Sequence, residues 1–260
     1  MHGEGGRCGR CGGATGVDAP VTLGLACVEL WGWLAYSSTL PFAGPVNRNN
    51  NLETEAMNPL NNHRHSLILG IVIAVVLALL LGGFNFYELG LARWFHIVSG
   101  VFWIGLLYYF NVAQTPALAD AAADKGGPGG AGITKYVAPR ALFWFRWGAV
   151  ATWIGGAWLL GRSGNFLGAF TFGAAGGASP PSYLAVIGTG AWLGTIMLFN
   201  VWVLIWPNQK KILGIVAATD EEKARARKTA GMASRVNFVL SIPMLMCMAG
   251  ATHGLPFIHG

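Results

Sequence analysis

The sequence contains very little charge for its length. Asp, Glu, Lys and Arg make up 11% of its 260 residues, whereas hydrophobic residues make up 53%. The mean hydropathy is +0.49, a value that ordinary soluble domains of this size do not approach. The composition therefore excludes a soluble globular domain and indicates an integral membrane protein.

The alternation of polar and apolar residues that a membrane β-barrel requires is also missing from the long apolar runs. Because backbone groups in lipid are satisfied only within helices or closed barrels, we predict an all-α, polytopic membrane helical bundle. Apolar runs of about 17–25 residues mark the spans of such a bundle. The five predicted spans are Leu67–Gly83, Leu91–Ala113, Ala141–Leu160, Tyr183–Trp206 and Val236–Leu255.

Several kinds of site have no counterpart in the sequence. There is no paired intramembrane carboxylate for proton-driven transport, no phosphate-binding Walker loop, and no nucleophile with a base beside it. No Cys-x-x-Cys-His motif is present, so we expect no covalently attached c-type haem.

The first sixty residues are harder to interpret than the rest. Residues 1–56 begin with a Gly-rich polar stretch, and we interpret them as an extension that is either disordered or not natural coding sequence. A sixth span near residues 20–40 stays open, because that apolar stretch is short and interrupted by Glu29. Met57 opens a normal lead-in to a membrane helix, so we assign the transmembrane domain to residues 57–260.

Basic residues predict the orientation. The connection between the fourth and fifth spans holds seven of them: Lys210, Lys211, Lys223, Arg225, Arg227, Lys228 and Arg235. By the positive-inside rule this connection is cytoplasmic, which puts the N-terminal side of the five-helix bundle in the cytoplasm and the C-terminus in the periplasm. The isoelectric point of about 9.4 then needs no nucleic acid partner, and the partner of the apolar surface is membrane lipid.

An internal repeat is visible in the bundle. WIGLLYYFNV at Trp103–Val112 matches WLGTIMLFNV at Trp192–Val201 in Trp, Gly, Phe, Asn and Val at one constant offset. The helices that follow match more faintly. We therefore predict two duplicated helical hairpins, formed by spans two and three and by spans four and five.

Two of the six histidines fall within the predicted spans. His96 lies about one turn below the outer interface in span two, and His253 lies at nearly the same depth near the end of span five. Equal depth on two core helices suits a bis-imidazole haem or a metal, so we predict His96 and His253 as ligands of a haem b iron. Arg93 shares a helical face with His96 and is predicted to pair a haem propionate or an anionic substrate. The alternative is that each histidine only hydrogen-bonds a neighbouring helix.

Four segments in particular carry a family resemblance. They are RWFHIVSGVFWIGLLYYFNVAQTPAL at Arg93–Leu118, PRALFWFRWGAVATWIGG at Pro139–Gly156, AWLGTIMLFNVWVLIWPNQKKILG at Ala191–Gly214 and SRVNFVLSIPMLMCMAGATHG at Ser234–Gly254. In combination they resemble the membrane domain of the bacterial cytochrome-linked urate oxidases, over about Leu67–Gly254.

The resemblance implies a protein of the bacterial inner membrane that hydroxylates urate. In that family electrons pass to a C-terminal cytochrome c domain; here the sequence ends at Gly260, where that domain would begin, so the implied acceptor is a separate periplasmic cytochrome c. The sequence is also similar to bacterial membrane protoporphyrinogen oxidases and copper-resistance membrane proteins, which share a histidine near a helix start. A structural or assembly subunit of a membrane complex is the alternative from a non-enzyme class.

Overall fold

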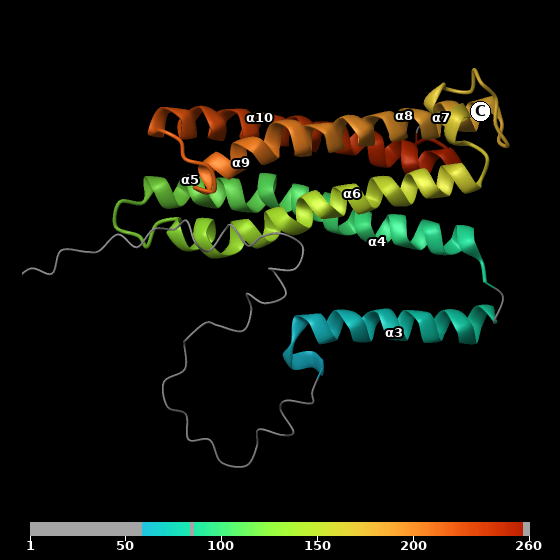
Figure 1. The fold of residues 1–260 in the computed structure, drawn as a ribbon, viewed down its shortest axis with the longest axis horizontal. Coiled ribbons are helices and arrows are strands. Elements are labelled where there is room, and N and C mark those ends of the chain that lie inside the picture. Colours follow the sequence, from blue (N-terminus) through green and yellow to red (C-terminus); the bar gives the residue numbers. More distant parts are fainter. Residues whose placement is uncertain (1–58, 84–85, 257–260) are drawn as a thin grey trace, which may run out of the picture. The chain divides into compact units, whose positions relative to one another are not determined.

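The computed structural model describes residues 59–83 and 86–256. The predictions for residues 1–56, including the open sixth span, lie outside the described residues. Within the described ranges every regular element is a helix (Figure 1). The predicted all-α class is therefore confirmed.

Each predicted span is largely helical, and several of the helices extend well beyond the predicted boundaries. In chain order, the elements are η3 (Pro59–Asn61), α3 (His63–Gly82), α4 (Glu88–Tyr108), η4 (Tyr109–Gln114), α5 (Thr115–Ala123), η5 (Ile133–Val137), α6 (Ala138–Arg162), α7 (Phe166–Phe170), α8 (Pro181–Phe199), η6 (Asn200–Ile205), α9 (Trp206–Ile212) and α10 (Asp220–His253). Several of them run on without a break, so that α4, η4 and α5 form one long rod, as do α8, η6 and α9.

Four helical rods of the described chain are long and apolar enough to cross a membrane, as judged by length and composition. They are His63–Gly82, Glu88–Ala123, Pro181–Ile212 and Asp220–His253. The remaining predicted span, Ala141–Leu160, is helical within α6, but Arg146 and several Trp and Gly residues lower its hydropathy. The chain is thus a membrane protein, and the number of five spans stays a prediction.

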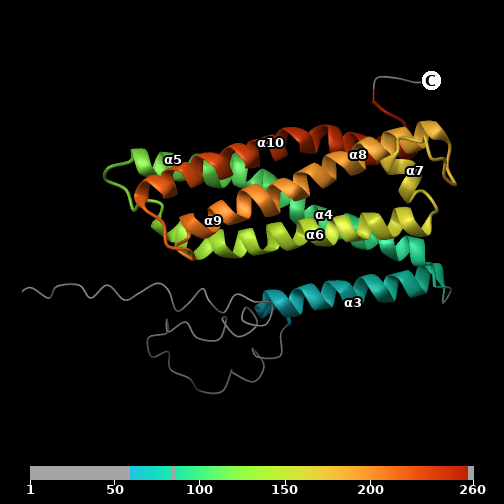
Figure 2. The same ribbon diagram turned by 45° about the horizontal axis from the view of Figure 1, so that its top comes forward.

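Helices α4, α6, α8 and α10 enclose one hydrophobic core (Figure 2). Helix α4 packs mainly against α6, and α8 packs mainly against α10, which are the two predicted hairpins. Their buried core side chains include Leu107, Phe145, Met197 and Met244. Large apolar side chains such as Val101 and Val239 remain exposed on the outer faces, as lipid contact requires.

The two hairpins share a local feature beyond their pairing. Each first helix changes from α-helical to π-helical winding within or directly beside the matched segment, in η4 on one side and η6 on the other. The equivalent asparagines, Asn111 and Asn200, lie in these π-helical segments. A third π-helical segment, η5, lies outside the matched segments, so the duplication stays a prediction.

The hairpins also place the predicted site residues at one end of the bundle. The start of α4, the end of α6, helix α7, the start of α8 and the end of α10 lie together, while α5 and α9 lie at the opposite end (Figures 1 and 2). His96 lies in the first half of α4, and His253 is the last residue of α10. The location of both histidines near one end of the bundle agrees with the prediction that they lie at nearly equal depth.

Candidate functional site

A cavity of about 880 Å³ lies between the two hairpins near this end of the bundle. Residues from α4, α6, α7, α8 and α10 line it. Most of the lining is apolar or small, and the polar side chains are few: Arg93, His96, Thr152, Ser163, Tyr183, Thr252 and His253, with Trp153 beside them. A mainly apolar cavity with a few converging polar groups is the usual form of a ligand site.

His96 is held in a defined orientation within this cavity. Its Nδ1 lies 2.8 Å from the backbone carbonyl oxygen of Thr152 on α6. A carbonyl can only accept, so Nδ1 carries the proton and donates it. In the neutral imidazole Nε2 then keeps its lone pair, which is the form that binds a metal or accepts a proton.

Two glycines of α6 lie directly against His96. A Cβ atom at Gly156 would lie 3.0 Å from His96 Cε1 and 3.1 Å from Nδ1, and one at Gly155 would lie 3.1 Å from His96 Cα. All three distances are shorter than ordinary van der Waals contact. The absence of side chains here lets α4 approach α6 closely enough for His96 to reach the Thr152 carbonyl.

Arg93 and His253 line the same cavity and are both exposed. Arg93 precedes His96 by about one helical turn on α4. His253 ends α10 because Gly254 adopts a positive φ of 88° and its N–H bonds to the Gly250 carbonyl, a conformation that favours glycine. The structure thus brings Arg93, His96 and His253 to one cavity, whereas their predicted roles stay predictions.

An ion pair and a hydrogen bond connect the end of α6 to the start of α4, beside the cavity. Arg162 at the end of α6 donates to Glu88 at the start of α4, over 2.8 Å. The indole of Trp158 donates to the other Glu88 oxygen over 2.9 Å. Glu88 therefore neutralises Arg162, which leaves Arg93 as the arginine that lines the cavity.

Two imidazoles, those of His96 and His253, line the cavity. No group of three or more His, Cys, Asp or Glu residues suited to a metal ion occurs among the described residues. Two imidazoles lining one largely apolar cavity are compatible with a non-covalent haem. Within residues 59–83 and 86–256, His96 and His253 are thus the candidate ligands for the predicted haem b.

Sequence reasoning missed several lining residues. Met244, Met248 and Thr252 all line the cavity, and their four-residue spacing puts them on one face of α10. The spacing of these three residues could have indicated that they share one face of the helix and line one site. No sequence signal could have identified the Thr152 carbonyl as the partner of His96, because every residue has a backbone carbonyl.

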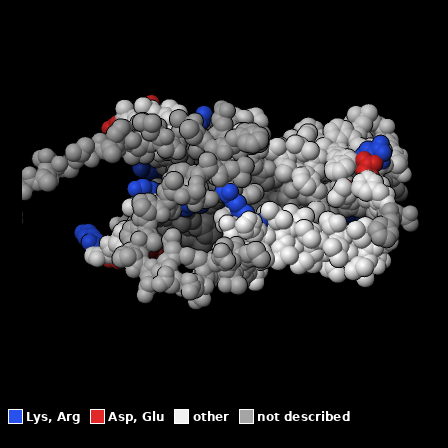
Figure 3. Space-filling view, turned by 60° about the horizontal axis from the view of Figure 1, so that its bottom comes forward, with Lys and Arg blue, Asp and Glu red and all other residues white. Residues whose placement is uncertain are grey.

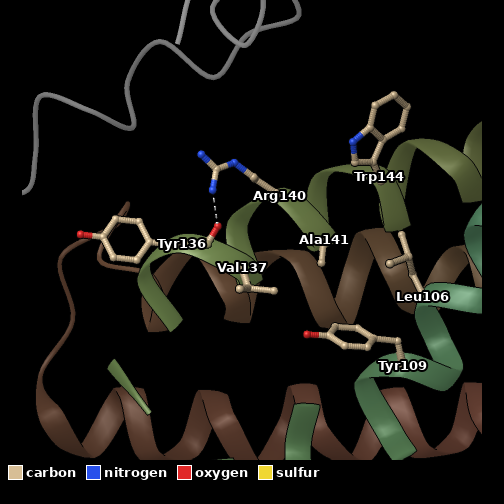
Figure 4. A pocket seen from close by; sticks show the side chains of 7 residues that line it. All are labelled: Leu106, Tyr109, Tyr136, Val137, Arg140, Ala141 and Trp144. Carbon is tan, nitrogen blue, oxygen red and sulfur yellow. Dashed lines mark hydrogen bonds between the residues drawn. The ribbon is translucent and has the colours of Figure 1, made fainter. Parts of the chain in front are cut away.

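A second pocket, of about 370 Å³, is lined by residues of α4, η4, η5 and α6. Figure 4 shows its seven lining side chains. Aromatic and aliphatic side chains line it, with Tyr109 from η4 and Tyr136 from η5 among them. Arg140 is the charged lining residue, and its Nη1 donates to the Tyr136 carbonyl over 2.8 Å. This pocket has no histidine in its lining, so it is not a second copy of the first site.

Comparison with known proteins gives one match. The family model described as Urate oxidase N-terminal matches residues 180–260. The matched segment holds α8, η6, α9 and α10, and therefore includes His253 but neither Arg93 nor His96. No curated protein and no solved structure matches the chain.

Proposed function

We propose that the chain oxidises urate in the membrane and passes the electrons to a separate cytochrome c, from the premise that residues 180–260 match the urate oxidase N-terminal family model. The observation that carries the proposal is the single cavity lined by Arg93, His96 and His253. The family match covers one wall of this cavity, on α8 and α10. The opposite wall, on α4, supplies the arginine and the oriented imidazole.

Urate is a planar heterocycle that carries a negative charge at neutral pH. Arg93 offers five N–H donors in a planar fork that suits an anionic, oxygen-rich ligand. Apolar side chains such as Ile97, Ile104 and Ile187 line the same cavity and would pack against the ring faces. We assign Arg93 the role of binding the substrate anion.

The imidazoles of His96 and His253 would hold the haem iron, and that group when bound would accept electrons one at a time. Hydroxylation of urate by water adds one oxygen atom and releases two electrons and two protons, so two single-electron transfers to an acceptor are needed. His96 is prepared for ligation because its Nδ1–H is fixed on Thr152 and its Nε2 is left free. Such a hydrogen bond sets the tautomer and ring direction of a ligating histidine.

The proposed orientation puts this cavity on the periplasmic side of the bacterial inner membrane, where a soluble cytochrome c would reach it. Lys and Arg side chains on the face in Figure 3 gather toward the end of the bundle that carries α5 and α9, and a basic cluster at the other end lies against an acidic one. Lys210 and Lys211 lie in the last turn of α9. This charge distribution supports a cytoplasmic placement of the α9 end.

Urate consumption by purified protein, measured at its absorption band with oxidised cytochrome c as acceptor, tests the proposal. We expect turnover only when the acceptor is present, and a b-type Soret band that is lost in His96→Ala and weakened in His253→Ala. Arg93→Ala should lower turnover by at least about tenfold, since a charge-assisted hydrogen bond contributes about 1.5–3 kcal/mol.

Arg140→Ala and His65→Ala are the matched controls, because Arg140 lines the other pocket and His65 lies near the start of α3. Both should behave like the unmodified protein. Unchanged urate with haem-loaded protein and a competent acceptor would favour the alternative function, a structural or assembly subunit. Protein that purifies without haem or metal would contradict the assignment of His96 and His253.

A further inference from the structure

Arg146 is a buried cation that the proposed reaction does not use. It lies on α6, and only 6% of its surface is exposed. Its guanidinium carbon lies 3.6 Å from the ring centre of Trp206 and 5.6 Å from that of Phe143. The arginine is therefore stacked on the first residue of α9.

A second cation approaches the same indole. The ammonium nitrogen of Lys210, in the last turn of α9, lies 5.9 Å from the ring centre of Trp206. Trp206 and Lys210 are both half-buried. Two positive groups from different helices thus converge on one aromatic ring.

Neither cation has an acidic partner within residues 59–83 and 86–256. The ion pairs there are Arg162 with Glu88 and Lys223 with Asp220. The contacts of the Arg146 guanidinium are with the rings of Trp206 and Phe143. A cation at membrane depth is costly unless it is paired, and contact with an aromatic face offsets only part of that cost.

We propose that Arg146 and Lys210, with Trp206 between them, bind the phosphate group of an anionic phospholipid at this end of the bundle. Arg146 lies within about 12 Å of the start of α6 along the helix axis, at the end of the bundle that carries α9 (Figures 1 and 2). Lipid phosphates lie at this boundary of the hydrocarbon layer, and arginine binds phosphate in a bidentate manner. Trp206 is suited to the same interfacial depth.

Retention of phosphatidylglycerol against phosphatidylcholine, measured by native mass spectrometry of protein released from mixed micelles, tests the site. We expect the unmodified protein to retain phosphatidylglycerol at least about fivefold better, the factor that one basic residue near an anionic membrane surface contributes. Arg146→Met and Lys210→Gln should each abolish the preference. Arg140→Gln is the matched control, because this arginine lies on the same helix and bonds to Tyr136 instead.

Inorganic phosphate forms a separate arm of the experiment. Thermal stabilisation by inorganic phosphate alone, absent in Lys210→Gln, would keep the phosphate site but make its natural ligand a soluble one. If Arg146→Met fails to fold, Lys210→Gln still decides the question, since Lys210 lies outside the buried core. An equal preference for phosphatidylglycerol in the unmodified protein and Lys210→Gln would overturn the proposal.

Discussion

The orientation of His96 depends on a neighbour that has no side chain. Its Nδ1–H bond to the Thr152 carbonyl is possible only while α4 and α6 lie close together, and Gly156 keeps them close. The Thr152 hydroxyl is already engaged with the Gly148 carbonyl over 2.7 Å, so it does not compete for the imidazole. The position of the His96 imidazole is therefore set by the Thr152 backbone carbonyl and by the absence of a side chain at Gly156.

Gly156→Ala tests this dependence at a single residue. The new methyl group would collide with the His96 ring, so we expect loss of the Thr152 bond, a destabilisation of about 1–3 kcal/mol and a population of both imidazole tautomers. Nitrogen-15 NMR of histidine-labelled protein reads the tautomer directly. Gly161→Ala is the control, because nothing lies within 4 Å of a Cβ atom at that position. A normal His96 signal in Gly156→Ala would contradict the role given to Gly156.

At this scale the sequence allowed a partial prediction of the site. Arg93 and His96 share a helical face, and His253 was placed at equal depth, so the residues of one cavity were identified from spacing and span boundaries alone. The Thr152 carbonyl and the contact at Gly156 could not be, because they arise from the crossing of two helices far apart in the sequence.

The helices are joined by buried amides at the level of the π-helical segments. Asn200 on η6 donates to the Asn237 side chain over 2.8 Å, and Asn237 on α10 donates to the Met197 carbonyl over 3.0 Å. Asn237 is completely buried. On the other hairpin, Asn111 donates to Ser234 over 2.9 Å. The matched asparagines thus both bind α10, one from each hairpin.

Asn237→Leu should destabilise the bundle more than its change in size suggests. It removes the acceptor of the Asn200 amide and the side-chain bond to the Met197 carbonyl, which keeps its backbone bond from Asn200 N–H. We expect a loss of about 1–2 kcal/mol, near the upper end for hydrogen bonds between membrane helices. Unfolding in mixed micelles with increasing dodecyl sulfate measures it. Asn208→Leu removes only an amide bond within its own rod and should change little. Equal stabilities for the two variants would show that the Asn200–Asn237 pair contributes nothing.

Helix ends were predicted less well than helix centres. Apolar composition put the start of the last span at Val236, whereas α10 begins at Asp220. The Thr219 side chain and Glu222 form a capping box that starts the helix in its polar part. Hydropathy identifies the part of a helix that suits lipid, and capping residues identify where it begins, so the two boundaries need not coincide.

For the molecule as a whole, the direction in which the hairpins cross the membrane decides which compartment supplies substrate and acceptor. If each hairpin crosses the membrane twice, as predicted, the cavity end and the α9 end face opposite sides. Seven basic residues lie in the segment that includes α9 and the start of α10. Moving such charges across the membrane during insertion is unfavourable, so we predict that the α9 end is cytoplasmic.

Reporter fusions measure this orientation directly. Alkaline phosphatase fused after Gly260 should be active, because it folds only in the periplasm, and green fluorescent protein inserted after Ala217 should fluoresce, because it matures in the cytoplasm. Ala217 is exposed and lies between α9 and α10, so the insertion leaves both helices intact. Phosphatase inserted after Ala175, an exposed residue between α7 and α8, should match the fusion after Gly260. The opposite pattern would put the cavity in the cytoplasm and exclude a periplasmic cytochrome c as its acceptor.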